Sequence, residues 1–459
     1  MTLSQRLQPL LSTLLTSPRL RDSLRQIHEA RRRISAAPHH VTAWLTLDDP
    51  YSYLLLQVLP RFCQHFNVEL QVRLLSGLPE ALFPEPELLA DYAMADASRL
   101  AQHHLLSFPQ RVSQPCANDT ALGNRILLAC EHLPAEQYLP LARQVFAALW
   151  EHQPTKLATL AERFSPLSEE DADLRLQQAR DDIGTAGHYL SATLQYAGEW
   201  YWGLDRLGHL TARLQDLGAA RFAHEFGLDE TASSFDADFL VSDWDQLAAI
   251  RALRLPLDFY FSFRSPYSYL ALPRVFALAE HYQLRLSIKP VLPMVMRGLP
   301  LPRQKRFYIL HDAKREAERL GLPFGRICDP LGTGVERCMA IFELAAERGL
   351  EQEYLLSVAR GIWAEGRNTA DDHDLKVLVE RSGLSWDEAC TMLANADWRH
   401  QAALHRQELE GMGLWGVPVF CLQTARQVLS VWGQDRLWAV EAAIADTVGL
   451  HAGQETSAV

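Results

Sequence analysis

The chain has 459 residues, with 44 Lys and Arg against 56 Asp and Glu, and a formal net charge of −12. Such an acidic surface repels phosphate backbones and anionic lipids, so we expect neither a nucleic acid nor a membrane surface as a partner. Hydrophobic residues make up 48% and charged residues 22% of the chain, which is typical of a folded globular protein and excludes a mainly disordered one. At roughly 150 residues per domain, this length predicts two or three domains.

The seven cysteines are too few and too scattered for a disulfide scaffold. No pair has the Cys-x-x-Cys spacing of a dithiol redox site, and none has the spacing of zinc ligands. No run of residues approaches the ~20 apolar residues of a membrane span. Because unpaired thiols are typical of a reducing compartment, we expect a cytoplasmic protein without a bound metal.

Residues 1–40 precede the first strand pattern, and we interpret them as an N-terminal helical arm. Leu10, Leu11, Leu14 and Leu15 share one helical face, which predicts an amphipathic helix. The first residues are poor in acidic side chains, which weakly resembles a mitochondrial presequence, but the apolar region of a secretory signal is missing. We favour the amphipathic helix.

Two motifs occur twice in the sequence. The pentapeptide Pro-Tyr-Ser-Tyr-Leu at 50–54 recurs at 266–270, an offset of 216 residues, and alternating apolar residues flank both pentapeptides at the same offset. The hexapeptide Trp-Gly-x-Asp-Arg-Leu at 202–207 recurs at 432–437, an offset of 230. Two matches in the same order, joined by matched strand patterns, predict an internal duplication.

The duplication divides the chain into five parts. The stretch between the copies is rich in Asp, Ser, Thr and Ala, which favours a linker. The predicted parts are the helical arm at 1–40, a first copy at 41–226, a linker at 227–254, a second copy at 255–448 and a frayed tail at 449–459.

Each copy is predicted to be an α/β domain, and the second copy is the clearer one. Its expected elements are a strand at 257–263, a helix ending at Tyr282, a strand at 284–288, a helical block at 303–409, strands at 416–422 and 428–431, and a helix at 435–444. The first three elements form a βαβ unit with the usual right-handed crossover. The whole order predicts two tandem thioredoxin-like domains, each with a helical insertion.

Ser265 stands at the junction of the first strand and first helix of the second copy. A Ser before Pro266 is ordinary chemistry for the start of a helix, where Ser caps and Pro fills the first turn. Alternatively, the positive end of the helix stabilises a bound thiolate, to which the hydroxyl donates. The aligned residue of the first copy is Asp49, which can cap a helix but, when ionised, cannot donate and repels a thiolate. In that case only the second copy is active.

Val417 and Pro418 open the hairpin of the second copy. A proline here marks a strand start or a cis bond, and a cis proline can leave the N–H and C=O of the preceding residue available to a peptide-like ligand. At an offset of 230, the first copy has Gly187 and His188 and no proline. We therefore expect the first copy to lack this ligand-binding edge.

Gln434 and Asp435 begin the last predicted helix. An N-cap explains Asp435, and it explains Asp205 of the first copy equally well. Alternatively, Asp435 pairs with a ligand ammonium group while nearby N–H groups bind its carboxylate. Lys305 belongs to a basic cluster, which is usually a solvated face but could also bind a ligand carboxylate.

Taken together, these residues resemble the 2-hydroxychromene-2-carboxylate isomerase and kappa-class glutathione transferase family. The resemblance spans nearly all of the second copy, in order, through 261–269, Lys305 and Tyr308, Ala317, 321–324, 415–420 and 432–437. It implies a thioredoxin-like fold with a helical insertion, glutathione as the cofactor, and a homodimer. It also implies that Ser265 lies beside the glutathione sulfur and that Lys305 lines the site. Val417 and cis-Pro418 would pair with the cysteinyl backbone, and Gln434 and Asp435 would hold the γ-glutamyl end.

The second copy departs from this family in two places. The Asn-x-Pro that members often carry is absent from 295–300, which removes a residue expected to contact glutathione or substrate. Arg264 adds a charge beside Ser265 and could lower the pKa of a neighbouring thiol. The disulfide oxidoreductases of this fold need Cys-x-x-Cys, and the sequence at 264–267 excludes dithiol exchange there.

We therefore predict a glutathione-dependent isomerase or transferase that acts on a small aromatic or unsaturated carboxylic acid through the second copy. The first copy would be inactive and act as a built-in dimer partner, so that the chain itself could be monomeric. The alternative is a non-catalytic binding or scaffold protein that retains only the fold. Redox chemistry at Cys338 or Cys421 is the least favoured interpretation.

Overall fold

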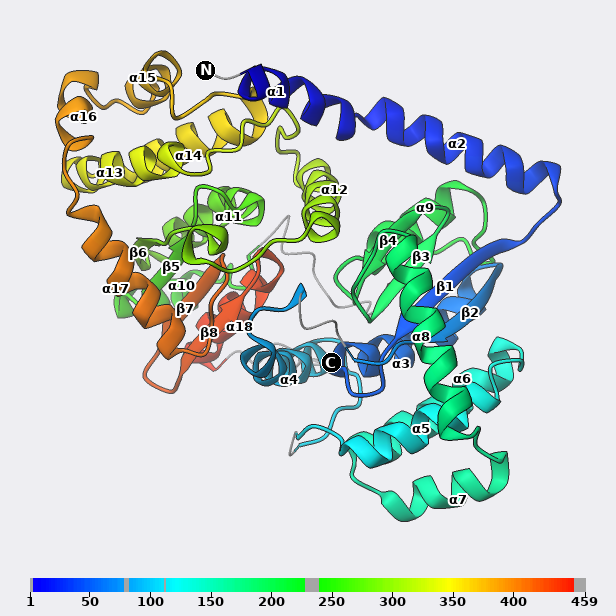
Figure 1. Cartoon of the computed structure of the whole chain (residues 1–459). Helices are drawn as coiled ribbons and strands as arrows, with labels where there is room; N and C mark the ends of the chain where they lie inside the picture. Colours follow the sequence, from blue (N-terminus) through cyan, green and yellow to red (C-terminus); the bar gives the residue numbers. More distant parts are fainter. Residues whose placement is uncertain (1–2, 78–81, 111–112, 228–238, 450–459) are drawn as a thin grey trace. The chain divides into compact units, whose positions relative to one another are not determined.

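The structure is a computed structural model, and it describes residues 3–77, 82–110, 113–227 and 239–449 (Figure 1). The chain divides into two compact units. The N-terminal unit is Ser23–Ala232, and the C-terminal unit combines Met1–Asp22 with Ser233–Val459. Apart from Gly449, the predicted frayed tail lies outside the described residues, as does 228–238 of the predicted linker. None of the described helices is long and apolar enough to cross a membrane.

The N-terminal unit is built on a four-stranded sheet with the strand order β2-β1-β3-β4. The central strand β1 is parallel to β2 and antiparallel to β3, which forms a hairpin with β4. The strands are β1 (His39–Leu45), β2 (Val68–Leu74), β3 (Thr193–Tyr196) and β4 (Glu199–Trp202). The helices are α2 (Pro18–Ile34, which begins in the C-terminal unit), α3 (Pro50–His65), α4 (Pro86–His103), α5 (Ala117–Ala129), α6 (Ala135–Trp150), α7 (Pro154–Phe164), α8 (Glu169–Thr185) and α9 (Leu207–Asp216).

The C-terminal unit has a second four-stranded sheet, with the order β6-β5-β7-β8 and the same strand directions. Its strands are β5 (Pro256–Phe261), β6 (Arg285–Pro290), β7 (Val419–Gln423) and β8 (Val428–Trp432). Its α-helices are α1 (Leu3–Leu15), α10 (Trp244–Leu253), α11 (Pro266–Tyr282), α12 (Arg303–Arg319), α13 (Thr333–Arg348), α14 (Glu351–Arg360), α15 (Asp372–Arg381), α16 (Trp386–Met392), α17 (Trp398–Gly411) and α18 (Leu437–Ala445). Short 3₁₀ turns occupy Met294–Arg297, Gln434–Arg436 and Asp446–Val448, and a π-helical turn occupies Gly361–Glu365.

The core of the C-terminal unit forms around β5, as the alternating apolar pattern predicts. Leu257, Phe259 and Phe261 are buried, and the ring of Phe259 stacks on Phe420 of β7 at a centroid distance of 5.2 Å. Tyr260, on the other face, is buried as well, so both faces of this central strand are covered. The strand therefore ends at a fixed point, which positions the start of α11.

Three predicted elements differ from the structure. The predicted linker contains α10, whose Leu247 and Ile250 belong to the core of the C-terminal unit. The helical block at 303–409 is interrupted after α12 by a non-helical segment that contains Gly325–Asp329. The arm at 1–40 forms two helices rather than one, and α1 belongs to the C-terminal unit.

The prediction that Asp435 and Asp205 are N-caps is wrong. Asp435 lies inside the 3₁₀ turn Gln434–Arg436, so α18 begins only after Arg436. Likewise, Arg206 precedes the first residue of α9. Neither helix has a side-chain hydrogen bond at its cap, so capping does not explain why both motifs carry an aspartate.

The hairpin of the C-terminal unit depends on a glycine that lies against a tryptophan. A Cβ atom at Gly416 would lie 2.1 Å from a ring carbon of Trp432, whose indole also packs edge-on against Trp415 at 4.8 Å. At Gly411, the end of α17, the space around such an atom is open.

We expect Gly416→Ala to lower the free energy of unfolding by about 2 kcal/mol, because the added methyl group must displace the indole. Gly411→Ala is the matched control, and it should be neutral or stabilise by up to ~1 kcal/mol. Urea unfolding of the full chain measures both values. Equal stabilities for the two variants would contradict the packing at Gly416.

Candidate functional site

Ser265 caps α11 as the sequence predicts. Its Oγ accepts a hydrogen bond from the Ser268 N–H at 3.1 Å, and Pro266 occupies the first turn. The same hydroxyl donates to the carbonyl oxygen of Val417 at 3.3 Å. The Val417–Pro418 bond is cis, as expected. The helix start and the hairpin edge, 152 residues apart in sequence, therefore form one surface.

A second contact joins this edge to Gln434 and Asp435. The carbonyl oxygen of Pro418 accepts from the Gly433 N–H at 2.9 Å, directly before Gln434. The Gln434 side chain is buried, with 1% exposure, and its amide donates to Glu316 Oε2 at 3.0 Å and to the Asp435 carboxylate. The predicted residues Ser265, Val417, Pro418, Gln434 and Asp435 are thus linked by direct contacts.

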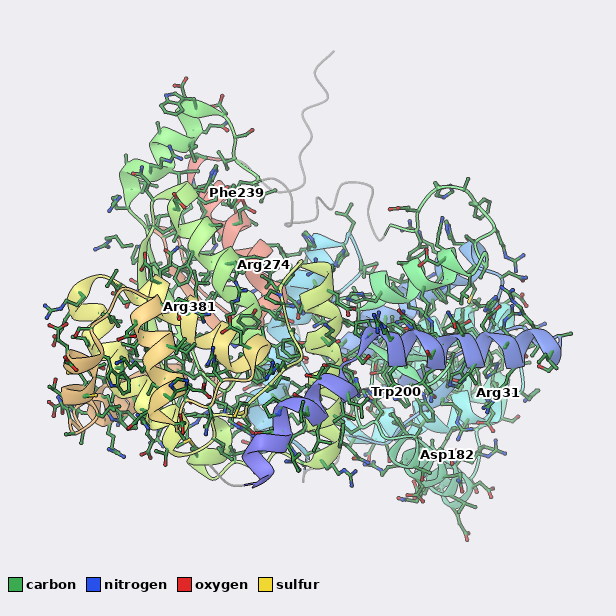
Figure 2. All side chains as sticks on the ribbon, turned by 90° about the horizontal axis from the view of Figure 1, so that it is seen from above. Arg31, Asp182, Trp200, Phe239, Arg274 and Arg381 are labelled. Carbon is green, nitrogen blue, oxygen red and sulfur yellow. The ribbon has the colours of Figure 1, made fainter. Side chains whose placement is uncertain are left out.

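Arg274 and Glu316 complete this set of contacts, and sequence analysis did not identify either residue. Arg274 lies on α11, next to the C-terminal segment of the chain, and donates to both the main-chain and side-chain oxygens of Gln434 (Figure 2). Glu316, on α12, is 1% exposed and also pairs with Arg319 at 3.0 Å. We call Arg274, Glu316 and Gln434 the polar triad, in which Glu316 and Gln434 are buried and Arg274 is half-buried.

The corresponding positions of the N-terminal unit are apolar. At the offset of 216, Arg274 and Glu316 align with Val58 and Leu100, and in the hexapeptide Gln434 aligns with Leu204. All three are buried, with exposures of 3%, 2% and 6% respectively. A position-by-position comparison of the two predicted copies would therefore have revealed the triad from the sequence.

A tyrosine–aspartate hydrogen bond supports this correspondence between the two units. Tyr267 donates to Asp312 at 2.8 Å in the C-terminal unit, and Tyr51 donates to Asp96 at 2.9 Å in the N-terminal unit. Both pairs are separated by 45 residues, so the offset of 216 extends into α12 and α4.

The capping position of the N-terminal unit has different chemistry. Asp49 caps α3 and accepts from the Tyr51 N–H at 3.1 Å, from Ser52 Oγ at 2.8 Å and from Ser191 Oγ at 2.7 Å. Burial raises the pKa of Asp49 to about 6, while these hydrogen bonds oppose the rise. An acceptor saturated in this way offers no donor to a thiolate.

The expected alignment of Val417 and Pro418 with Gly187 and His188 is wrong. Trp44 pairs with Thr193 in one sheet, whereas the corresponding Tyr260 pairs with Val419 in the other. This register places Ser191 and Ala192 at the positions of Val417 and Pro418. The error arose because the offset changes inside the hairpin: two residues lie between Tyr196 and Glu199, but six lie between Leu422 and Leu429. The N-terminal unit still lacks a proline at this position.

A cavity of about 550 Å³ lies next to the start of α11, although Ser265 is not among its lining residues. Arg264 and Pro266, which flank Ser265 in sequence, both line the cavity. The guanidinium of Arg264 binds both carboxylate oxygens of Asp329 at 2.7 Å. This pairing offsets the positive charge that was expected to lower the pKa of a neighbouring thiol.

Lys305 lies in the first turn of α12 and is half-buried. Burial lowers the pKa of its ammonium group. Two other basic residues of this turn, Arg303 and Arg306, line the described cavity, whereas Lys305 is not among its lining residues. The basic cluster thus reaches the cavity through two side chains that the sequence did not distinguish.

Comparison with known proteins concerns the C-terminal unit. Residues 256–445 match the family model of the DSBA-like thioredoxin domain. The C-terminal part is similar to 2-hydroxychromene-2-carboxylate isomerase of Pseudomonas putida, with 29% identity over 204 residues that cover 41% of this chain and 93% of that protein. This unit therefore carries a DSBA-like thioredoxin domain with isomerase homologues.

Two solved structures resemble the chain. One is a 2-hydroxychromene-2-carboxylate isomerase, with a TM-score of 0.36 and 23% identity, covering 42% of this chain and 95% of that one. The other is the cytosolic disulfide reductase DsbM of Pseudomonas aeruginosa with GSH, with a TM-score of 0.31 and 21% identity, covering 43% of this chain and all of that one.

We expect Arg274→Val to destabilise the full chain by about 2 kcal/mol, because it leaves the main-chain and side-chain oxygens of the buried Gln434 without their donor. Replacing all three triad residues by their N-terminal counterparts (Arg274→Val, Glu316→Leu, Gln434→Leu) should restore stability to within ~1 kcal/mol of the intact protein. Urea unfolding measures both variants, with the unchanged N-terminal unit as an internal reference. A triple variant less stable than the single one would contradict this account.

Proposed function

We propose that the C-terminal unit binds glutathione and acts as a glutathione-dependent isomerase or transferase on a small aromatic or unsaturated carboxylic acid. The observation that carries the proposal is the line of contacts from Ser265 through Val417 and Pro418 to the polar triad. Charged groups buried in this way stabilise a fold less than apolar residues of similar size, and the N-terminal unit has apolar residues at all three positions. The polar residues of the C-terminal unit are therefore best explained by a ligand that they help to bind.

The dimensions of the site suit a tripeptide thiol. Arg274 follows Ser265 by nine residues along α11, which corresponds to about 13 Å of helix. An extended tripeptide spans roughly 10 Å and its γ-glutamyl linkage adds to this length, so it reaches from Ser265 to Gln434 and Asp435. Within the described residues, the Val417 N–H has no hydrogen-bond acceptor, which suits pairing with a cysteinyl backbone.

The residues of the site have separate tasks in this proposal. Ser265 stands at the positive end of α11, where its hydroxyl can turn from the Val417 carbonyl to donate to a thiolate. Asp435 holds the ligand ammonium group, and Arg274 and Glu316 keep Gln434 in place beside it. When bound, glutathione supplies a thiol that adds reversibly to an unsaturated acid and so permits rotation about its double bond.

We also propose that the two copies arose by duplication and that the N-terminal copy is inactive. Its saturated Asp49 and its apolar residues in place of the triad support inactivity. On the resemblance stated above, this copy takes the role of a second subunit. The full chain should then be monomeric at micromolar concentration, which light scattering tests; a stable homodimer would contradict this role.

The alternative is a non-catalytic binding protein, and one observation favours it. The Gln434 side chain is buried, and its amide already donates to Glu316 and Asp435. A ligand must therefore use the groups around it or displace one of these bonds.

Titration calorimetry with reduced glutathione tests the proposed function. The intact chain should bind, and Asp435→Ala should weaken binding at least tenfold, because the ligand ammonium group loses its charged partner. Ser265→Ala should weaken binding when the thiolate predominates. Asp205→Ala is the matched control for Asp435 in the N-terminal unit, and Ser191→Ala, which removes a serine hydroxyl from that unit, is a second control; both should bind like the intact chain. No binding by the intact chain would favour the non-catalytic alternative.

A further inference from the structure

Helix α1 is attached to the C-terminal unit by polar side chains one helical turn apart. Gln8 Oε1 accepts from the Asp329 N–H at 3.2 Å, and Ser12 Oγ accepts from the Ile327 N–H at 2.9 Å. Thr16 Oγ1 donates to the Gly325 carbonyl oxygen at 3.3 Å. Every fourth residue of a helix advances by ~6 Å, and every second residue of an extended chain by ~6.6 Å. Because these two spacings are nearly equal, the helix and the extended segment stay in register over all three contacts.

Two glycines let α1 approach closely. A Cβ atom at Gly325 would lie 2.4 Å from Thr16 Oγ1, and one at Gly366 would lie 2.8 Å from Pro9. Both glycines have a positive φ, which disfavours any other residue. The C-terminal unit is therefore shaped to receive α1, although α1 lies outside the residues that match the DSBA-like domain.

The helix is oriented with its apolar face outwards, contrary to the usual outcome for an amphipathic helix. Ser12 and Thr16 are buried, whereas Leu10 and Leu14 are exposed by 63% and 59%. Leu11, exposed by 58%, lines the cavity beside Ser265, as does Leu15. Figure 1 shows α1 next to α12, which contributes Arg303, Arg306, Phe307 and Leu310 to the same cavity.

The lining indicates what the cavity binds. The stacked rings of Phe324 and Trp363, 5.9 Å apart, lie at one side and suit a flat apolar body. Arg303 and Arg306 are exposed residues of the lining, and within the described part of the chain neither has a carboxylate partner. Arg264, in contrast, is neutralised by Asp329. The positive charge without a carboxylate partner in this lining is therefore on α12, where the guanidinium of Arg303 lies 5.3 Å from the ring centroid of Phe307.

We propose that α1 is a wall of the substrate site and that the cavity between α1 and α12 binds a flat aromatic carboxylate beside Ser265. Leu11 and Leu15 cover the apolar body, and Arg303 and Arg306 bind the carboxylate. This inference deepens the proposed function and rests on it for the identity of the site. It assigns one part of substrate selection, the contact with the apolar body, to a helix outside the residues that match the DSBA-like domain.

Calorimetry with 2-naphthoate, without glutathione, tests the wall. The intact chain should bind, and Leu11→Trp should weaken binding at least tenfold because the larger side chain fills the cavity. Leu14→Trp is the matched control, since Leu14 is equally exposed but does not line the cavity, and it should bind like the intact chain. No binding by the intact chain, or equal binding by the two variants, would overturn the proposal.

The neutral analogue 2-naphthamide tests the role of charge. The double variant Arg303→Gln and Arg306→Gln should lose at least fivefold in affinity for 2-naphthoate and less than twofold for 2-naphthamide. Equal losses for both compounds would overturn the carboxylate assignment. Binding of 2-naphthoate that depends on Leu11, in a chain that does not bind glutathione, would support the wall and refute the proposed function. A chain that binds glutathione, but whose binding of 2-naphthoate is absent or independent of Leu11, would refute the role of α1 and leave the proposed function intact.

Discussion

The arrangement of the C-terminal unit depends on the buried side chain of Gln434, which accepts from Arg274 and donates to Glu316. This pairing joins three elements that are distant in sequence: α11, α12 and the turn before α18. Through Gly433 and Pro418 it also fixes the hairpin edge that meets Ser265. Gln434 and Glu316 are held in one geometry, because leaving a polar group of either buried residue unpaired is costly. Apolar side chains would fill the same space with less directional preference.

The N-terminal unit shows the outcome when that constraint is relaxed. Its sheet has the same order and the same strand directions, and its tyrosine–aspartate hydrogen bond is retained. The positions of the triad are apolar, and the cap is a carboxylate that its neighbours saturate. The fold thus persists without the polar groups of the site. The residues common to the two units are therefore those that the fold requires, and the polar residues present only in the C-terminal unit belong to its site.

The sequence predicts a structural feature when the residues that cause it are close together in the chain. The cap at Ser265 and the strands around Phe259 follow from short patterns, and the structure confirms them. Asp435 was misplaced because a 3₁₀ turn and a helix start look alike over three residues. The Gly187 alignment failed because an insertion inside a hairpin leaves no local trace. The contacts of α1 could not be predicted, because Gln8, Ser12 and Thr16 find their partners more than 300 residues away.

The discontinuity of the C-terminal unit also sets an order of assembly during synthesis. Ser12 leaves the ribosome before its partner Ile327, which follows 315 residues later. At ~5–20 residues per second, that interval lasts roughly 15–60 s, and the N-terminal unit is complete before it ends. Throughout this interval α1 has no docking surface, and its exposed leucines are available to chaperones. The helix that lines the cavity is thus made before the segment that holds it, and it can be put in place only afterwards.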